Sequence, residues 1–282
     1  MKKILVAIDF SEGSINALEH ALVLAKKNGS DIIMVWVNPD TFKFLIKEEG
    51  NGKENTKAET AFESLWKQYN SEMGTGKLEY VITQGQIYEE IVKIALVEDV
   101  DLLVCGTHGV SGFSEFWMGS TAFRLIMASS VPVLSVQNKI ASKKTIDKIL
   151  LPIDSTIETR QKIVIAVELA KKFDAEIHVL SLYTTKVEEI RMLVDSYSKQ
   201  TVKYAESEGV KCILTNVYGG NITNLTLDYA DEISADLIVI MTEQEISTMN
   251  LWMGTYAKQM VNHSKIPVLS IKPKELIKTL SR

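Results

Sequence analysis

The chain has little of what marks a secreted or a nucleic-acid-binding protein. Its 282 residues include two cysteines, Cys105 and Cys212, which argues against a disulfide scaffold and suits a reducing compartment. The formal net charge of −5 provides no attraction to nucleic acids or anionic membranes. The apolar run after Met1 stops at Asp9, far short of a signal peptide or a membrane span. We therefore expect a cytoplasmic protein with no nucleic-acid or membrane partner.

Two common phosphate-binding motifs are also missing, because the chain contains neither a Walker loop nor a G-x-G-x-x-G spacing. It does contain a glycine-rich stretch, residues 104–121, between a predicted strand and a predicted helix. Glycines allow positive φ and leave backbone N–H groups uncovered, so an anion can approach them closely. Ser120 and Thr121 open the helical pattern, where free N–H groups and the helix dipole favour phosphate. The stretch is either a phosphate cradle or an ordinary strand-to-helix turn.

The chain contains two copies of one pattern. Asp101-Leu-Leu-Val recurs 135 residues later as Asp236-Leu-Ile-Val, and Trp-Met-Gly-Ser at 117–120 recurs at the same offset as Trp-Met-Gly-Thr at 252–255. Near the beginnings of the copies, residues 4–11 match residues 149–156. This repetition predicts two tandem domains, 1–138 and 145–275, joined by a connector over 138–144.

Each copy alternates between β-branched apolar runs and amphipathic segments. The first predicted helix is capped by Ser11 or Ser14 and ends at Gly29. The alternation predicts two tandem doubly wound parallel sheets with helices on both faces and five strands in each sheet. Ligands bind such sheets beyond the carboxyl ends of the strands, where the strand order reverses, so Asp9 and the loop after Gly106 should meet there. The predicted strands are 3–8, 31–37, 78–83, 101–105 and 131–136, followed by 148–153, 176–182, 211–217, 236–241 and 266–271.

The spacing Gly106-x2-Gly109-x9-Gly119-Ser120 resembles the nucleotide-binding signature of the ATP-binding branch of the universal stress protein family. The segments 8–11, 35–38 and 131–134 carry the same resemblance. It implies an adenine nucleotide alpha hydrolase-like fold, a role in stress response or regulation, and ATP as the ligand, with AMP and ADP as alternatives. By this resemblance the adenine would lie near Ala7, Asp9, Val37 and Cys105, and the ribose and phosphates along Gly106, Gly109, Gly119, Ser120 and Thr121.

Individual side chains near this loop have alternative roles. Since the loop has no lysine, we expect a divalent metal such as Mg or Mn to accompany the phosphates. Asp9 would contact the nucleotide or, through water, its metal, and it equally fits a turn at the strand-to-helix junction; both roles can coexist. His108 is either a donor to a phosphate or a plain solvent-facing loop residue.

The second copy departs from the glycine pattern. Through the 135-residue offset, Gly106, Gly109 and Gly112 are replaced by Met241, Gln244 and Ser247. Glu243 and Glu245 add two carboxylates where phosphates would lie. Side chains would fill the cradle and the acids would repel an anion, so we expect this degenerate copy to bind ATP weakly or not at all.

The last strand of each copy, 131–136 and 266–271, would be an exposed sheet edge that seeks pairing. Pairing of these two strands within the chain would make it a pseudo-dimer, and a further homodimer stays open. The leading hypothesis is an ATP-binding regulatory module with at most weak ATPase activity, because no base with an orienting partner is recognisable near the loop. The alternatives are a ligand-free interaction scaffold and an enzyme that uses ATP for slow hydrolysis or adenylylation.

Overall fold

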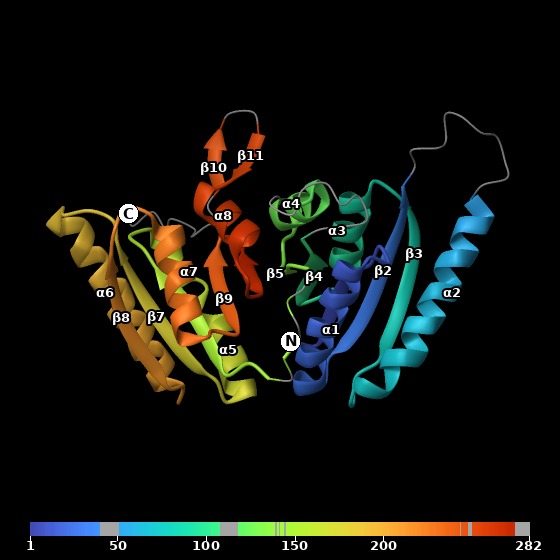
Figure 1. Cartoon of the computed structure of the whole chain (residues 1–282), viewed down its shortest axis with the longest axis horizontal. Helices are drawn as coiled ribbons and strands as arrows, with labels where there is room; N and C mark the ends of the chain where they lie inside the picture. The colour runs from blue at the N-terminus through green and yellow to red at the C-terminus, as the bar shows by residue number, and fades with distance from the viewer. Residues whose placement is uncertain are drawn as a thin grey trace, which may run out of the picture.

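The computed structural model describes residues 1–39, 51–107, 118–138, 140, 142–143, 145–242, 244–247 and 250–273. One alternation of strands and helices occurs in each half (Figure 1). The first half comprises β1 (Lys3–Ala7), α1 (Glu12–Asn28), β2 (Asp31–Pro39), α2 (Asn51–Tyr69), β3 (Leu78–Gly85), α3 (Ile87–Val97), β4 (Leu102–Gly106), α4 (Ser120–Ala128) and β5 (Val133–Val136), with a short 3-10 helix at Asn70–Glu72.

The second half repeats this order with two additions, a 3-10 helix η3 before its first α-helix and a hairpin before its last. Its elements are β6 (Lys148–Ile153), η3 (Ile157–Arg160), α5 (Ile163–Phe173), β7 (Glu176–Tyr183), α6 (Glu188–Ser207), β8 (Cys212–Tyr218), α7 (Ile222–Ile233), β9 (Leu237–Met241), β10 (Gln244–Ser247), β11 (Asn250–Met253), α8 (Thr255–His263) and β12 (Val268–Ile271).

The two predicted five-stranded sheets are present and are joined edge to edge into one sheet of ten strands. Its order is β3-β2-β1-β4-β5-β12-β9-β6-β7-β8, and neighbouring strands within each half run parallel. At the centre β5 and β12 pair antiparallel, with Leu134 opposite Leu269. Ser135 adds a hydrogen bond of 3.1 Å from its Oγ to the carbonyl oxygen of Val268. The expected pairing of the last strands within the chain is therefore confirmed.

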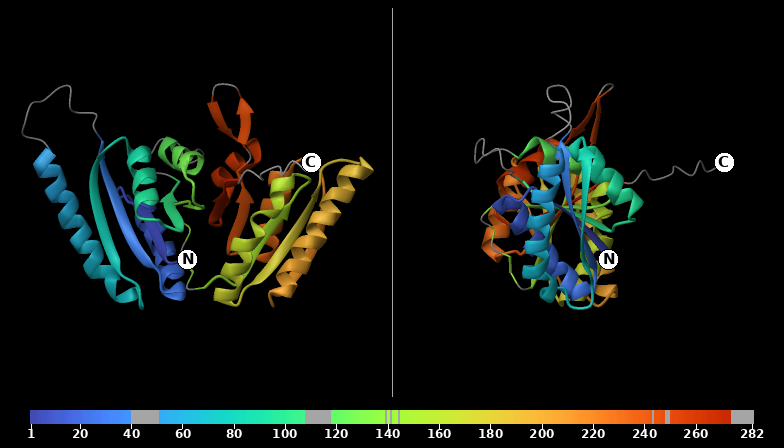
Figure 2. Two further views of the ribbon diagram at one scale, coloured as in Figure 1. Left: turned by 180° about the vertical axis from the view of Figure 1, so that it is seen from behind. Right: turned by 90° about the vertical axis from the view of Figure 1, so that its right-hand side faces the viewer.

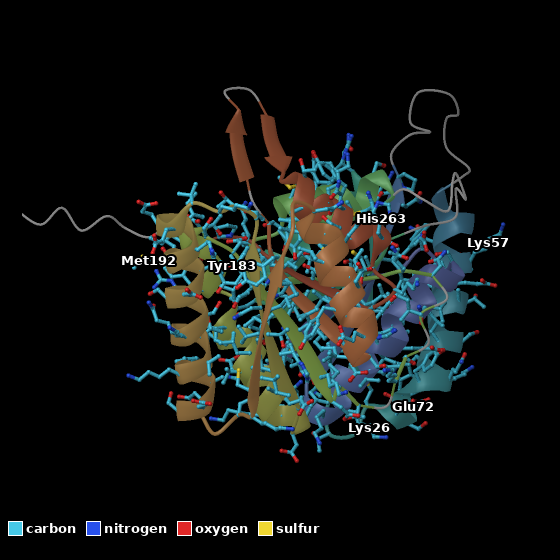
Figure 3. All side chains as sticks on the ribbon, turned by 60° about the vertical axis from the view of Figure 1, so that its left-hand side comes forward. Lys26, Lys57, Glu72, Tyr183, Met192 and His263 are labelled. Atoms are coloured by element: carbon cyan, nitrogen blue, oxygen red, sulfur yellow. The ribbon has the colours of Figure 1, made fainter. Side chains whose placement is uncertain are left out.

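Helices cover both faces of the sheet, as the alternation predicted. On one face the buried side chains of α1, α2, α5 and α6 pack in one cluster, and on the other those of α3, α4, α7 and α8 pack in a second. Figure 2 shows the sheet between these layers from two further directions. Side chains fill the space between sheet and helices, whereas Lys26, Lys57 and Glu72 are exposed on the outside (Figure 3).

The first helix begins and ends for the reasons that its sequence indicated. Ser11 is the N-cap, and its Oγ accepts a hydrogen bond of 3.2 Å from the Ser14 backbone N–H. Gly29 ends the helix with φ of 70°, a left-handed conformation that glycine adopts without a steric penalty. These caps set the helix register so that its apolar face covers β1 and β4.

The β10–β11 hairpin was not predicted, and it projects away from the sheet in Figure 1 and in the two views of Figure 2. It follows β9 directly, at the place where the first half has the stretch between β4 and α4. Among the described residues, none of the helices combines the length and the apolar character that a membrane span needs.

Candidate functional site

A cleft of about 400 Å³ opens at the carboxyl ends of β1 and β4, the switch point at which the strand order of the first half reverses. We call it the switch-point cleft. The helices α3 and α4 lie side by side (Figure 1), and both contribute residues to the lining of the cleft. The structure brings eight of the ten predicted site residues together in this cleft: Ala7, Asp9, Val37, Cys105, Gly106, Gly119, Ser120 and Thr121. The other two, His108 and Gly109, lie outside the described residues.

One wall of the cleft is apolar and suits a planar ring. Val37 and Cys105 come from the ends of β2 and β4, and Ile91 and Leu125 come from α3 and α4. Burial raises the pKa of the Cys105 thiol to about 12, so this sulfur is a neutral, unreactive part of the wall. Trp36 also lines the cleft, although the sequence patterns did not single it out.

Asp9 serves as a turn residue at the strand-to-helix junction. Its Oδ1 accepts hydrogen bonds from the backbone N–H and the Oγ of Ser11, at 3.0 and 2.5 Å. The second half repeats the arrangement, since Asp154 Oδ1 accepts from the backbone N–H and Oγ1 of Thr156. The turn role is therefore present in both halves, and Asp9 also lines the cleft.

The residue after Asp9 has an uncommon backbone conformation. Phe10 has φ of 62°, in the left-handed region that bulky residues rarely adopt. Its ring is held between Trp36 and Phe62, with centroid distances of 6.4 and 5.0 Å. Strained residues of this kind concentrate at functional sites, and this one lies between Asp9 in sequence and Trp36 in space, both of which line the cleft.

Gly119 and the first turn of α4 form the polar end of the cleft. The backbone N–H of Gly119 donates to the carbonyl oxygen of Thr107 at 2.8 Å, so its own donor is already used. Helix geometry leaves the N–H groups of Ser120, Thr121 and Ala122 without acceptors inside the helix. These donors, the two hydroxyls and the helix dipole are the features that an anion site at a helix N-terminus would use.

A cation that the sequence patterns missed lies one turn further along α4. The cleft continues into a neighbouring hollow of about 390 Å³, which shares Ser120 and Thr121 with it and is also lined by Arg124. The Arg124 guanidinium lies over the Tyr88 ring, 5.2 Å from its centroid. Arg124 is four residues after Ser120 and therefore on the same helix face, a spacing that could have identified it.

The corresponding region of the second half is built differently. Met241 occupies the position of Gly106 and is buried. Where α1 begins directly after its cap, the second half has the 3-10 helix η3 and then α5. Lys162 is also buried there, and its Nζ donates to Thr159 Oγ1 at 3.0 Å. Gly254 nevertheless caps α8 with the same backbone conformation as Gly119, with φ and ψ of −56° and 148° against −58° and 148°.

The second half also contacts the polar end of the switch-point cleft. The backbone N–H of Met118, next to the cap residue Gly119, donates to Asn262 Oδ1 of α8 at 2.7 Å. Gln137 Nε2 donates to the carbonyl oxygen of Val261 on the same helix at 3.1 Å. The position of the α4 N-terminus therefore depends on both halves.

The described residues contain no group of three His, Cys, Asp or Glu side chains that would hold a metal by themselves. Asp9 is the carboxylate that lines the cleft.

The fold and the cleft define a doubly wound α/β protein with two tandem copies of one domain and a ligand-sized cleft in the first copy. The sequence model of the universal stress protein family matches residues 1–137 and again residues 145–272. The chain belongs to the universal stress protein family.

Individual relatives agree with this assignment. Universal stress protein MJ0577 of Methanocaldococcus jannaschii is 31% identical in an alignment 155 positions long that covers 49% of this chain and 96% of that protein. Universal stress protein E of Photorhabdus laumondii is 21% identical in an alignment 300 positions long, gaps included, that covers 96% of this chain and 95% of that protein. A universal stress protein structure from Archaeoglobus fulgidus superposes with a TM-score of 0.77 at 20% identity, covering 96% of this chain and 98% of that one.

Proposed function

We propose that the first half of the chain binds an adenine nucleotide, with ATP as the preferred ligand, and that the bound nucleotide regulates the contacts of the protein. The observation that carries the proposal is the switch-point cleft, where an apolar wall and the N-terminus of α4 face one space of about 400 Å³. That volume lies within the range of small-molecule sites, about 300 to 1,000 Å³.

In this proposal the adenine lies against Val37 and Cys105, at the apolar end. The phosphates accept hydrogen bonds from the first turn of α4 and from the hydroxyls of Ser120 and Thr121. Among the described residues that line the adjoining hollow, Arg124 is the basic one, so the terminal phosphate points toward it. A magnesium or manganese ion would be carried on the phosphates.

We propose that the second half does not bind ATP. Met241 provides a side chain where Gly106 has none, and the start of the helical segment is rearranged into η3. The β10–β11 hairpin replaces the stretch that leads to the helix cap. One nucleotide per chain is the expected stoichiometry.

The proposal has a direct test. Protein stripped of nucleotide by unfolding and refolding is titrated with ATP and magnesium in a calorimeter, and thermal unfolding is followed in parallel. At 100 times Kd the ligand stabilises the fold by about 2.7 kcal/mol, which raises Tm by about 5 to 10 °C for a chain of this size. An unchanged Tm, or two equivalent ATP molecules per chain, contradicts the proposal. Any release of phosphate from ATP by the protein should be slow, as expected of a nucleotide-binding module with at most weak ATPase activity.

A further inference from the structure

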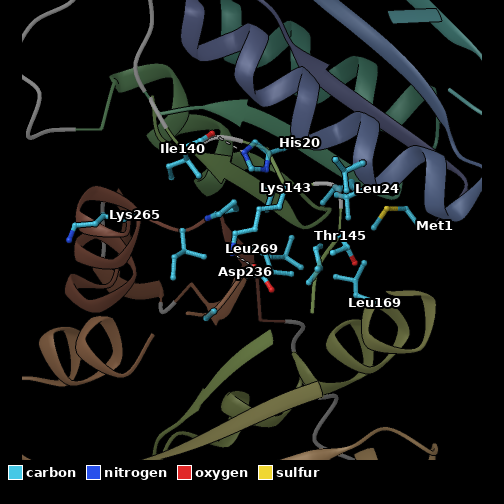
Figure 4. A pocket seen from close by; sticks show the side chains of 18 residues that line it. Met1, His20, Leu24, Ile140, Lys143, Thr145, Leu169, Asp236, Lys265 and Leu269 are labelled. Carbon is cyan, nitrogen blue, oxygen red and sulfur yellow. Dashed lines mark hydrogen bonds and ion pairs between the residues drawn. The ribbon is translucent and has the colours of Figure 1, made fainter. Parts of the chain in front are cut away.

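A second cavity, of about 150 Å³, lies between the two halves and shares no lining residue with the switch-point cleft (Figure 4). We call it the seam cavity. Its apolar wall is supplied by both halves: Val23, Leu24 and Leu134 from the first, and Leu169, Leu237 and Leu269 from the second. It is open to the same sheet face that α1 and α5 cover.

The cavity has a structural cause. The central strands β5 and β12 have four residues each, and the helices α1 and α5 on this face belong to different halves. The space above the central strands is lined instead by residues between β5 and β6, among them Ile140 and Ile146. Domain interfaces of this kind are common places for ligand sites.

Two lysines, Lys143 and Lys265, line the cavity. The Lys265 side chain is 81% exposed and its Nζ lies 3.5 Å from Asp231 Oδ2, so we assign the charged contact to Lys143. Lys143 Nζ pairs with Asp236 Oδ1, and Figure 4 shows its side chain directed across the cavity toward Asp236. Asp236 Oδ2 is separately held by the backbone N–H groups of Asp147 and Lys148, at 2.9 and 3.0 Å. An ammonium group has three donors, so two remain beyond this pair. The Lys143 side chain is 62% exposed, which places the ammonium near the mouth.

A histidine provides a second polar group. His20 Nε2 lies 3.2 Å from the carbonyl oxygen of Ile140. Since a carbonyl accepts, this nitrogen carries the proton and Nδ1 is left as an acceptor. Burial is the main cause that lowers the pKa of His20, with the nearby Glu19 carboxylate acting in the opposite sense. At neutral pH the ring is therefore an uncharged part of the wall.

We propose that the seam cavity is a binding site for a small amphipathic carboxylate. Its apolar body, one aromatic ring or a short alkyl chain, fills the leucine-lined space, and its carboxylate accepts from Lys143 at the mouth. An apolar cavity of about 150 Å³ is known to take up a ligand the size of benzene. Because the wall comes from both halves, such a ligand stabilises their association, independently of any nucleotide in the switch-point cleft.

The probes are hexanoate and hexanamide, which have the same chain and differ in charge. Binding to the full chain is measured by calorimetry and by NMR shifts of the leucine methyl groups. We expect one hexanoate per chain, bound about fivefold more tightly than hexanamide, the ratio for one partly exposed charged contact. Lys143→Gln should remove this preference and leave hexanamide binding unchanged.

Val23→Phe fills the cavity from α1 and should abolish the binding of both probes. Val164→Phe makes the same exchange at an exposed position of α5 that does not line the cavity, so it should leave binding intact. A cooperative thermal unfolding transition in each variant shows that its fold is intact. Equal affinity of the wild type for both probes, absence of saturable binding, or binding that survives Val23→Phe in a folded protein would overturn the proposal.

Discussion

Gly106 at the end of β4 lies against the backbone of Gly13 in α1. A Cβ at position 106 would lie 2.9 Å from both the carbonyl carbon and the carbonyl oxygen of Gly13, and 3.3 Å from the backbone nitrogen of Ser14. The close approach of β4 and α1 therefore requires a glycine at position 106. The second half has Met241 there, and its chain after β6 forms η3 before α5 begins.

Gly106→Ala should destabilise the protein, because the clash involves backbone atoms that cannot move without shifting α1. Overpacking of this kind costs about 1 to 3 kcal/mol. In urea unfolding, the lower stability should appear as a lower midpoint concentration of urea, with an unchanged dependence of the unfolding free energy on urea concentration. Gly220→Ala is the matched control, since a Cβ there meets nothing within 4 Å. Equal stability of the two variants would show that the contact with Gly13 is not limiting.

Ser120→Asp should abolish ATP binding and leave the fold intact. A carboxylate in the first turn of a helix suits the helix dipole, whereas it repels a phosphate at the same place. We expect at least a 100-fold higher Kd, about 2.7 kcal/mol, by calorimetry. Thr255→Asp makes the equivalent change at the start of α8 and should leave ATP affinity unchanged. Loss of binding in this control instead would place the nucleotide in the second half.

Asn262→Ala should weaken ATP binding from the opposite half of the chain. The change removes the acceptor that holds the Met118 N–H, next to the α4 cap. Met118 is partly buried, so leaving its N–H unpaired should cost near the lower end of the about 1 to 3 kcal/mol of a buried donor. Part of this cost should appear as a Kd raised about three- to tenfold. Asn262→Gln keeps a neutral amide acceptor and should lose less affinity than Asn262→Ala. If both variants bind like the wild type, α4 is positioned without this contact.

Stability should fall as the pH drops below about 6.5 because of His20. Its pKa is lowered in the fold from an ordinary 6.5, mainly by burial, so below that pH the unfolded chain binds more protons than the folded one. Stability is then lost with falling pH until the lowered pKa is passed, at no more than about 1.4 kcal/mol per pH unit. Urea unfolding at pH 7.5, 6.5 and 5.5 measures the slope. His20→Gln should flatten it, and an equal slope in this variant would assign the effect to other groups.

Much of the fold follows from local patterns. The Val, Ile and Leu runs identified the ten strands of the main sheet, because strands buried on both faces carry apolar side chains in succession. The internal repeat indicated the two halves, and Ser11 and Gly29 marked the ends of α1 for reasons confined to a few neighbouring residues. The hairpin β10–β11 was not predicted, because the polar and apolar residues of 244–253 show no clear strand alternation.

The sequence could predict which residues line the switch-point cleft, because strand ends and helix starts are local features and a parallel sheet brings them to one edge. It could not predict which backbone contacts each of these residues makes. Gly106 was expected to lie along the ribose and phosphates, which stays a prediction, and the structure adds its close contact with Gly13. The donor of Gly119 is used by Thr107. Both facts depend on which backbone approaches which, and no spacing of residues encodes that distance.

The strands, the repeat and the switch point were thus contained in the order of the residues, because each depends on a short run of side chains. Tertiary packing alone placed Asn262 against Met118 and put Arg124 beside the cleft. It also created the seam cavity, whose walls come from both halves. These features depend on how two complete domains meet along β5 and β12, and that meeting is decided by the shapes of whole surfaces.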